Sequence, residues 1–191
     1  MKTNRFGQAA VLSSTQLDQL IAALPANHHQ VLAEVCRRTG CRISEARQLQ
    51  WQSISESHIT FPKTITKGKL KSRTIPQVPK LREVFAQWRH EWAAINGRQP
   101  MNGDFVFTGR FAGQCLSSRA FMDALNAASH ECGLEGVSSH SFRRSALTSA
   151  HNAGVPLSHL MALSGHESMS ALQRYLHVTE DQKDQAAMSF A

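Results

Sequence analysis

One tyrosine stands among the 191 residues, and it is a candidate nucleophile. Tyr175 lies nine positions after His166, which follows Gly165 in the segment SGHESMSALQRY. A phenol in water has a pKa near 10, so ionising it at pH 7 costs about 4 kcal/mol, and a reactive phenol needs a base or a strongly cationic setting. A tyrosine considered alone is more often a packing residue. The cations and histidines elsewhere in the chain therefore decide between the two roles.

Two groups of arginines lie where helices are predicted to begin. Arg42 directly precedes the helix that opens with SEARQL, and His140, Arg143 and Arg144 lie in or near the first turn of the helix within SSHSFRRSALTSA. A cation at a helix N-terminus is unfavourable by about 0.3–1 kcal/mol, unless a bound anion shares the free N–H groups. The alternative is that these side chains reach solvent or pair with carboxylates, as Arg42 could with Glu45. Both groups together favour an anion site.

A third basic element is the segment ITKGKLKSRTIP, in which Lys67, Lys69, Lys71 and Arg73 surround a turn. Alternation along the flanking strands sends some of these side chains to one face and the turn lysines outward. A charged edge that prevents aggregation is the ordinary explanation. The other explanation is contact with a DNA backbone, with one lysine inserted into a cleft.

The elements that must position these residues are mostly helical. A capping box at Ser13 and Gln16 starts the first helix, which ends near Pro25, and β-branched residues over 57–78 indicate two or three short antiparallel strands. The tail, 179–191, is acidic at first and then small and apolar. The predicted fold class is mainly α with a small antiparallel β-sheet (α+β). Helical spacing is found over 12–25, 28–40, 44–51, 81–92, 117–132, 140–153, 157–163 and 169–176.

Composition limits the class of partner. Lys and Arg number 21 against 14 Asp and Glu, giving a net charge of +7. This excess favours a polyanion, with nucleic acid ahead of an anionic membrane, although a basic protein without such a partner fits equally well. No apolar run reaches membrane-spanning length and no signal-peptide core is present, which predicts a cytoplasmic protein. The cysteines form no C-x-x-C pair, which favours reduced thiols over zinc or disulfides; they are Cys36, Cys41, Cys115 and Cys132.

Three segments resemble the motifs of the tyrosine recombinase (phage integrase) catalytic domain, and they follow one another along the chain in the same order as in that family: TGCRISEARQLQW, HSFRR and LSGHESMSALQRYLHV. The resemblance runs over about 12–178. It implies one catalytic domain across 1–191 with a C-terminal tail at 179–191 and no separate N-terminal core-binding domain, as in short stand-alone members; an isolated catalytic fragment is the alternative. It also implies the catalytic set Arg42, His140, Arg143, His166 and Tyr175, with Glu45 in support.

The family's catalytic lysine usually lies in the β-hairpin, eight residues before a proline. Lys67 lies nine residues before Pro76 and follows Thr66 at the strand end, which makes it the preferred match. Lys69 is the alternative. The difference corresponds to one inserted residue in the turn.

The activity that the resemblance implies is integrase-type site-specific DNA recombination through a 3′-phosphotyrosyl intermediate, without metal, cofactor or ATP. Tyr175 would attack the phosphodiester, Arg42 and Arg143 would stabilise the transition state, and Lys67 would protonate the leaving 5′-oxygen. His140 would accept the phenol proton or bond the phosphate, and His166 would be a second phosphate donor. Glu45 would orient Arg42.

The implied partners are double-stranded DNA and further copies of the chain, which would associate as a tetramer on DNA. The C-terminal tail could pass to a neighbouring copy or pack on its own domain. Two other functions remain open, a type IB topoisomerase and a catalytically silent DNA-binding protein. Further DNA contacts are predicted at Lys69, Lys71, Arg73, Arg144 and Arg174.

Overall fold

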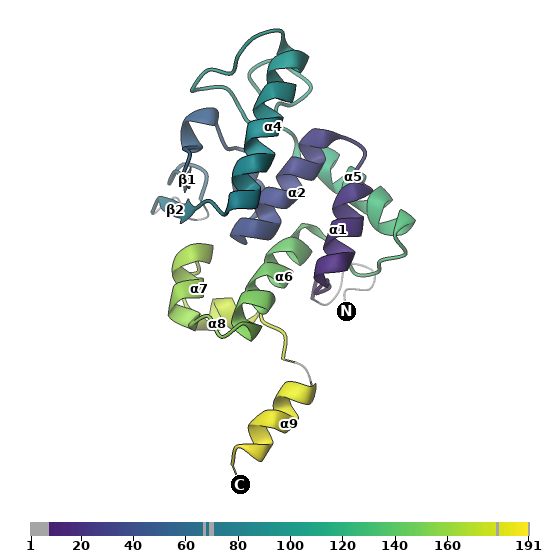
Figure 1. Cartoon of the computed structure of the whole chain (residues 1–191), viewed down its shortest axis with the longest axis vertical. Coiled ribbons are helices and arrows are strands. Elements are labelled where there is room, and N and C mark those ends of the chain that lie inside the picture. Colours follow the sequence, from purple (N-terminus) through teal and green to yellow (C-terminus); the bar gives the residue numbers. More distant parts are fainter. Residues whose placement is uncertain (1–7, 67, 69–70, 179, 191) are drawn as a thin grey trace.

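The computed structural model describes residues 8–66, 68, 71–178 and 180–190, and it is mainly helical with one small antiparallel sheet. Figure 1 shows the arrangement. The predicted fold class is confirmed. In chain order the elements are α1 (Ser14–Ala22), α2 (Asn27–Thr39), α3 (Ile43–Ala46), the 3-10 turn η1 (Trp51–Ser53), β1 (His58–Phe61), β2 (Arg73–Pro76), α4 (Pro79–Asn96), α5 (Ser118–Glu131), α6 (Ser139–Asn152), α7 (Leu157–Ser164), α8 (Met169–Gln173) and α9 (Glu180–Met188).

Helix α2 is central to the main body, because it packs against α1, α4 and α6 (Figure 1). The capping box predicted for α1 is present, since the Ser13 side chain accepts from the backbone N–H of Gln16 and the Gln16 side chain accepts from that of Ser13. Helix α2 ends at Thr39, and the left-handed backbone of the following Gly40 (φ 61°) turns the chain toward α3. These two signals fix where the first helices begin and end.

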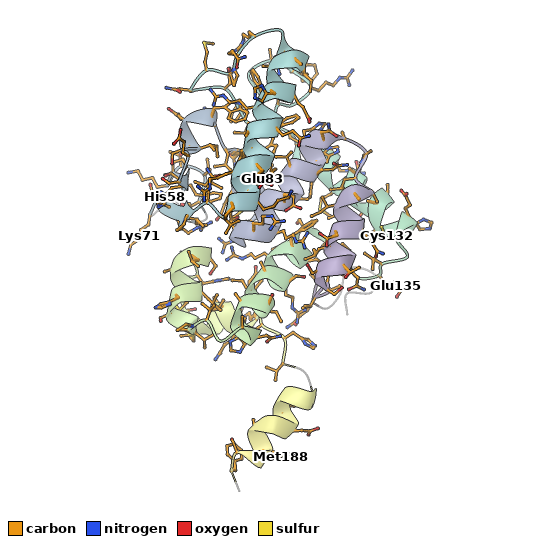
Figure 2. All side chains as sticks on the ribbon, viewed as in Figure 1. His58, Lys71, Glu83, Cys132, Glu135 and Met188 are labelled. Carbon is orange, nitrogen blue, oxygen red and sulfur yellow. The ribbon has the colours of Figure 1, made fainter. Side chains whose placement is uncertain are left out.

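The hairpin pairs β1 with β2 in antiparallel register, with Ile59 opposite Ile75 and Phe61 opposite Arg73. Ile59, Phe61 and Ile75 face inward and are buried in the main core. Arg73 shares the inward face of its strand with Ile75, as the period-two alternation requires. The hairpin is therefore anchored by its apolar side chains, while Lys71 is exposed at its outer edge (Figure 2).

Two hydrophobic clusters hold the described residues together. The larger one contains the buried side chains of α1, α2, α4 and α5, the hairpin, and Phe142 of α6. The smaller one is formed by Leu147, Leu160 and Leu172, from α6, α7 and α8, with Tyr175 packed against it. Helix α6 thus contributes to both clusters and joins them.

The helix predicted over 44–51 is shorter than expected. Helix α3 ends at Ala46, because the backbone that follows bonds across to residues 104–106 instead. The carbonyl of Leu49 accepts from Val106, and the N–H of Trp51 donates to the carbonyl of Asp104. These long-range bonds replace the i to i−4 bonds that would have continued the helix.

The end of the chain also differs from the expectation. The helix predicted over 169–176 ends at Gln173, and the tail forms α9, which Figure 1 shows standing apart from the other helices. The exposed Met188 lies on α9 (Figure 2). Among the helices described, none is both long and apolar enough to cross a membrane.

Candidate active site

Arg42 is held at the start of α3 by Glu45. The Glu45 carboxylate accepts from the backbone N–H of Arg42 at 3.1 Å and from its Nη1 at 2.9 Å. The pairing predicted as one alternative for Arg42 is therefore present. Arg42 keeps part of its side chain exposed, whereas Glu45 is fully buried. The carboxylate thus fixes a guanidinium that still faces the surface.

Arg143 lies at the centre of the site and is fully buried. It extends from α6 to donate from Nη1 to the carbonyl oxygen of Gly40 at 2.7 Å. Its Nη2 lies 2.9 Å from Nε2 of His166. Burial, followed by the charge of Arg42, lowers the pKa of Arg143 to about 10, so the guanidinium remains protonated at neutral pH.

His166 follows α7 directly after Gly165, whose left-handed backbone (φ 68°) ends that helix. The imidazole is nearly buried, and its Nδ1 lies 2.7 Å from Oγ of Ser164. Burial, followed by the positive charges of Arg143, Arg42 and Arg73, lowers the pKa of His166 to about 3. The ring is consequently neutral at physiological pH.

Tyr175 lies just beyond α8, where Thr148 of α6 donates a side-chain hydrogen bond to its carbonyl oxygen. Its ring lies with its centroid 4.9 Å from that of His166, and Cζ of Arg143 lies 5.1 Å from the ring centroid. The phenol oxygen is 3.4 Å from Nδ1 of His140. The tyrosine therefore sits among cations and imidazoles of its own chain rather than in an apolar core alone.

One cavity of about 620 Å³ brings these groups together. Among the described residues that line it are arginines, histidines and serines but no carboxylate, so it suits an anion. Ser138 and Ser139, at the start of α6, lie on its wall. The predicted catalytic residues that line it are Arg42, His140, Arg143, His166 and Tyr175.

A second cavity of about 540 Å³ adjoins the hairpin and shares Arg42 and His166 with the first. Glu45, Lys71 and Arg73 also line it. The two candidates for the catalytic lysine, Lys67 and Lys69, lie outside the described residues.

Arg73 was predicted to contact DNA, but its guanidinium here faces the interior. It donates from Nη2 to Glu45 at 2.8 Å and from Nη1 to the carbonyl oxygen of Ser164 at 3.1 Å. Cζ of Arg73 also lies 4.8 Å from the centre of the Phe61 ring. Burial would raise the pKa of Glu45, but Arg73 and Arg42 together hold it below its ordinary value. Arg73 thus joins the hairpin to α3 and to the end of α7, and DNA contact by this side chain stays a prediction.

The other predicted DNA contacts differ in exposure. Arg144 is nearly buried and donates from Nη1 to the carbonyl oxygen of Ala9 at 2.6 Å, which ties the N-terminal segment to the rim of the first cavity. Arg174 is exposed on the same rim, and Lys71 is exposed beside the second cavity. The last two remain accessible to a ligand.

Sequence reasoning missed the structural role of Ser164 and the inward direction of Arg73. Alternation with the buried Ile75 could have indicated the latter. The cysteines are free thiols, and the sulfur atoms of the buried Cys36 and Cys41 lie 3.9 Å apart. Nowhere in the described part of the chain do three or more side chains of the metal-binding types gather in one site.

The chain is also similar in sequence to known proteins. The model of the phage integrase family matches residues 10–182. Tyrosine recombinase XerC of Pediococcus pentosaceus is 31% identical over 152 residues, which make up 78% of this chain and 50% of that protein. The chain thus spans about half the length of the curated relatives it matches.

Solved structures show the same fold. The XerA recombinase superposes with a TM-score of 0.76 at 16% identity, covering 98% of this chain and 65% of that one. The XerH site-specific recombinase was solved in a pre-cleavage complex with its difH substrate. It superposes with a TM-score of 0.72 at 19% identity, covering 99% of this chain and 56% of that one. At these identities the likeness concerns the fold.

Proposed function

This chain belongs to the phage integrase family, and from that premise we propose that it is a site-specific DNA recombinase that cleaves and rejoins DNA through a 3′-phosphotyrosyl intermediate. The observation that carries the proposal is the position of Tyr175, whose ring lies beside Arg143 and His166 and whose hydroxyl approaches His140. Its curated relatives are named tyrosine recombinases, and the XerH neighbour was solved with its DNA substrate.

The first step is attack of the Tyr175 oxygen on a DNA phosphorus atom. Nδ1 of His140, 3.4 Å from that oxygen, is placed to accept the phenol proton. The new bond joins the phenol oxygen to phosphorus, and the bond from phosphorus to the 5′-oxygen breaks. The product is a 3′-phosphotyrosyl link and a free 5′-hydroxyl.

Negative charge grows on the non-bridging oxygens during this attack. Arg42 and Arg143 supply fixed positive charge at the cavity wall, and both are oriented before substrate arrives by Glu45 and by the Gly40 carbonyl. A preorganised donor of this kind typically contributes about 10²–10³ in rate. The arginines thereby stabilise the charge that a metal ion stabilises in other phosphoryl-transfer enzymes.

The leaving 5′-oxygen needs a proton, and we assign that role to Lys67 of the hairpin, with Lys69 as the alternative. The adjoining cavity supports this assignment, since its lining includes Thr66 and Lys71 from either side of the turn. Rejoining reverses the steps, and the phosphotyrosyl bond conserves the energy of the phosphodiester. No ATP is then required.

Recombination joins two DNA sites, so the proposal includes assembly of four copies on DNA. Helix α9 supports it, because it stands apart from its own body (Figure 1). It ends at the exposed Met188, and the exposed Phe190 follows two residues later. Removing residues 179–191 is expected to leave cleavage by single copies and to reduce the size of the protein–DNA complex, as measured by light scattering.

Covalent capture tests the activity on DNA whose target sequence is not specified in advance. A library of duplexes with randomised arms and a nick beside the randomised centre loses its short 5′-hydroxyl strand after cleavage, which traps the adduct. Wild-type protein is expected to form denaturant-resistant adducts with recurrent sequence, and Tyr175→Phe none. Equal adduct from Tyr175→Phe would exclude Tyr175 as the nucleophile.

The same library separates the other functions. Specific binding without adduct by wild-type protein would indicate a silent DNA-binding protein. Adducts without sequence preference, together with relaxation of supercoiled plasmid, would indicate a topoisomerase. Either result would overturn the recombinase proposal.

A further inference from the structure

Ser164, the last residue of α7, has a fully buried hydroxyl that lies between two polar atoms. Its Oγ is 2.6 Å from the carbonyl oxygen of Leu160 and 2.7 Å from Nδ1 of His166. A carbonyl oxygen only accepts, so at this distance the single hydroxyl proton must lie between Ser164 and Leu160. The serine then has only lone pairs to offer the imidazole, and Nδ1 must carry a proton.

The contact with Arg143 shows independently that the ring is neutral, so that Nδ1 carries its single proton and Nε2 is bare. Nη2 of Arg143 lies 2.9 Å from Nε2 of His166, and 3.3 Å from Nδ1. A donor this close to both ring nitrogens lies over the ring face, where a neutral imidazole can accept a cation and a charged one cannot. A doubly protonated ring would place a second positive charge against the guanidinium at 2.9 Å. The neutral ring also agrees with the low pKa of His166.

From these contacts we propose that Ser164 is a positioning residue, which fixes the single proton of His166 on Nδ1, leaves Nε2 bare and thereby holds a neutral imidazole against the guanidinium of Arg143. The guanidinium is then held at both ends before DNA arrives, by the Gly40 carbonyl at Nη1 and by the imidazole at Nη2. The chain of contacts runs from the Leu160 carbonyl through Ser164 and His166 to Arg143.

This arrangement changes the part that His166 plays in the DNA-free protein. A ring protonated on Nδ1 alone has no proton on Nε2 to donate to a phosphate, so the expected donor role would require a change of tautomer. In the state described here, His166 acts on the reaction through Arg143. The consequence for cleavage rests on the proposed recombinase function, whereas the tautomer itself does not.

The tautomer can be measured directly. In DNA-free protein labelled with ¹⁵N-histidine, two-dimensional NMR of the imidazoles distinguishes protonated from bare ring nitrogens, and comparison with His166→Gln identifies the His166 signals. Wild-type protein is expected to show Nδ1 protonated and Nε2 bare. Ser164→Ala, which removes the acceptor for Nδ1–H, is expected to show a mixture of the two tautomers.

Cleavage of a captured duplex gives the second measurement. At saturating DNA, Ser164→Ala is expected to slow the first-order cleavage rate by roughly five- to tenfold, the loss of about one net hydrogen bond, while the Kd for DNA is unchanged. Ser164→Thr retains the hydroxyl and should restore the Nδ1-protonated signature.

Ser129→Ala is the matched control. Ser129 is likewise buried in a helix and donates to the carbonyl oxygen four residues earlier, that of Leu125, at 2.7 Å, but it forms no hydrogen bond to an imidazole in the described structure. It should leave both the His166 signals and the cleavage rate unchanged. A loss in Ser129→Ala equal to that in Ser164→Ala would reduce the effect to helix packing and overturn the proposal.

Two further results would overturn it. One is wild-type protein with the proton of His166 on Nε2, and the other is a tautomer that does not respond to Ser164→Ala. Absence of adduct from wild-type protein would instead count against the recombinase function, because the NMR measurement decides the tautomer without any cleavage.

Discussion

At the scale of single residues, Glu45 has the most demanding position in the site. Its side chain is 1% exposed, and its two oxygens pair with Arg42 at 2.9 Å and with Arg73 at 2.8 Å. Burying a carboxylate is costly unless it is paired and hydrogen-bonded, and removing one member of a buried pair leaves the others without compensation. Glu45 therefore stabilises the fold and positions Arg42 through the same contacts.

Glu45→Gln is expected to lower the free energy of unfolding by about 3 kcal/mol, because the amide keeps the volume but leaves two guanidinium groups without a counter-charge. Cleavage should fall at least tenfold, since Arg42 loses its orienting partner. Urea unfolding and adduct formation measure the two effects. Glu83→Gln is the control, because Glu83 is 67% exposed and its pair with Lys80 contributes at most about 1 kcal/mol. Equal stability of the two variants would refute the role of Glu45.

Protonation of the buried His29 is expected to make the free energy of unfolding depend on pH. This residue is nearly buried, and neither ring nitrogen has a hydrogen-bond partner within the described structure. Burial, followed by the charge of His28, lowers the pKa of His29 from 6.5 to about 4. Between these values the unfolded chain binds a proton that the folded protein does not. The contribution of His29 to the free energy of unfolding is therefore fully present above about pH 6.5 and is lost as the pH falls toward 4.

Replacing His29 by Leu should remove its share of this decline, about 3 kcal/mol for one such group. The share of His166, whose pKa is also lowered, should remain. Thermal unfolding between pH 4 and pH 7 measures it. The exposed His130→Gln is the control and should retain the wild-type slope. An unchanged slope in His29→Leu would assign the acid sensitivity to other groups.

At the scale of elements, local signals predicted the helices whose ends depend on neighbouring residues. The capping box at Ser13 and the glycine at position 40 act within a few residues, and the sequence shows them directly. The length of α3 depends instead on backbone bonds from Leu49 and Trp51 to residues more than fifty positions away. No local pattern contains that information, and so the predicted helix was too long.

The same distinction applies to the site. Motif order predicted which side chains gather in the cavity, but not how they bond to one another. Arg73 had the appearance of a surface cation, yet it bonds to Glu45 and to the Ser164 carbonyl. Ser164 lay within the third motif segment but had no assigned role. Such pairings arise only when β2, α3 and the end of α7 meet.

Gly165 is the point at which the end of α7 approaches the hairpin. Its backbone is left-handed, and a Cβ there would collide with Nη1 of Arg73. Gly165→Ala is expected to displace either the Arg73 guanidinium or the His166 loop, to lower stability by about 2–4 kcal/mol, and to reduce cleavage at least tenfold. Urea unfolding and the capture assay measure both.

Gly97 separates the collision from the backbone strain. It has nearly the same φ, 66° against 68°, but a Cβ there meets nothing within 4 Å. Gly97→Ala should therefore show the strain alone, about 1 kcal/mol, with unchanged cleavage. If the two alanine variants lost equal stability and activity, contact between Gly165 and Arg73 would not be the cause.

At the scale of the whole molecule, the cavity is bordered by both hydrophobic clusters. Arg42 and Glu45 adjoin the larger one through α3, whereas His166 and Tyr175 belong to the segment that packs on the smaller one. Helix α6 joins the two and carries His140 and Arg143 between them. The nucleophile and the arginines thus depend on different clusters held in register by a single helix.

This architecture predicts which copy of the chain supplies the tyrosine. Tyr175 lies over Arg143 of its own chain, with the carbonyl of Tyr175 bonded to Thr148 of the same α6, so attack is expected in cis. The variant Tyr175→Phe has the arginine but lacks the nucleophile, whereas Arg143→Ala has the nucleophile but lacks the arginine. If attack is in cis, an equimolar mixture should form no more adduct than either variant alone, because no chain in it holds both groups. Adduct restored by mixing would show that a neighbouring copy delivers the tyrosine. In that case, the mixture repeated with both variants lacking residues 179–191 would test whether α9 is needed to pass the tyrosine segment between copies, since loss of α9 should abolish the restored adduct.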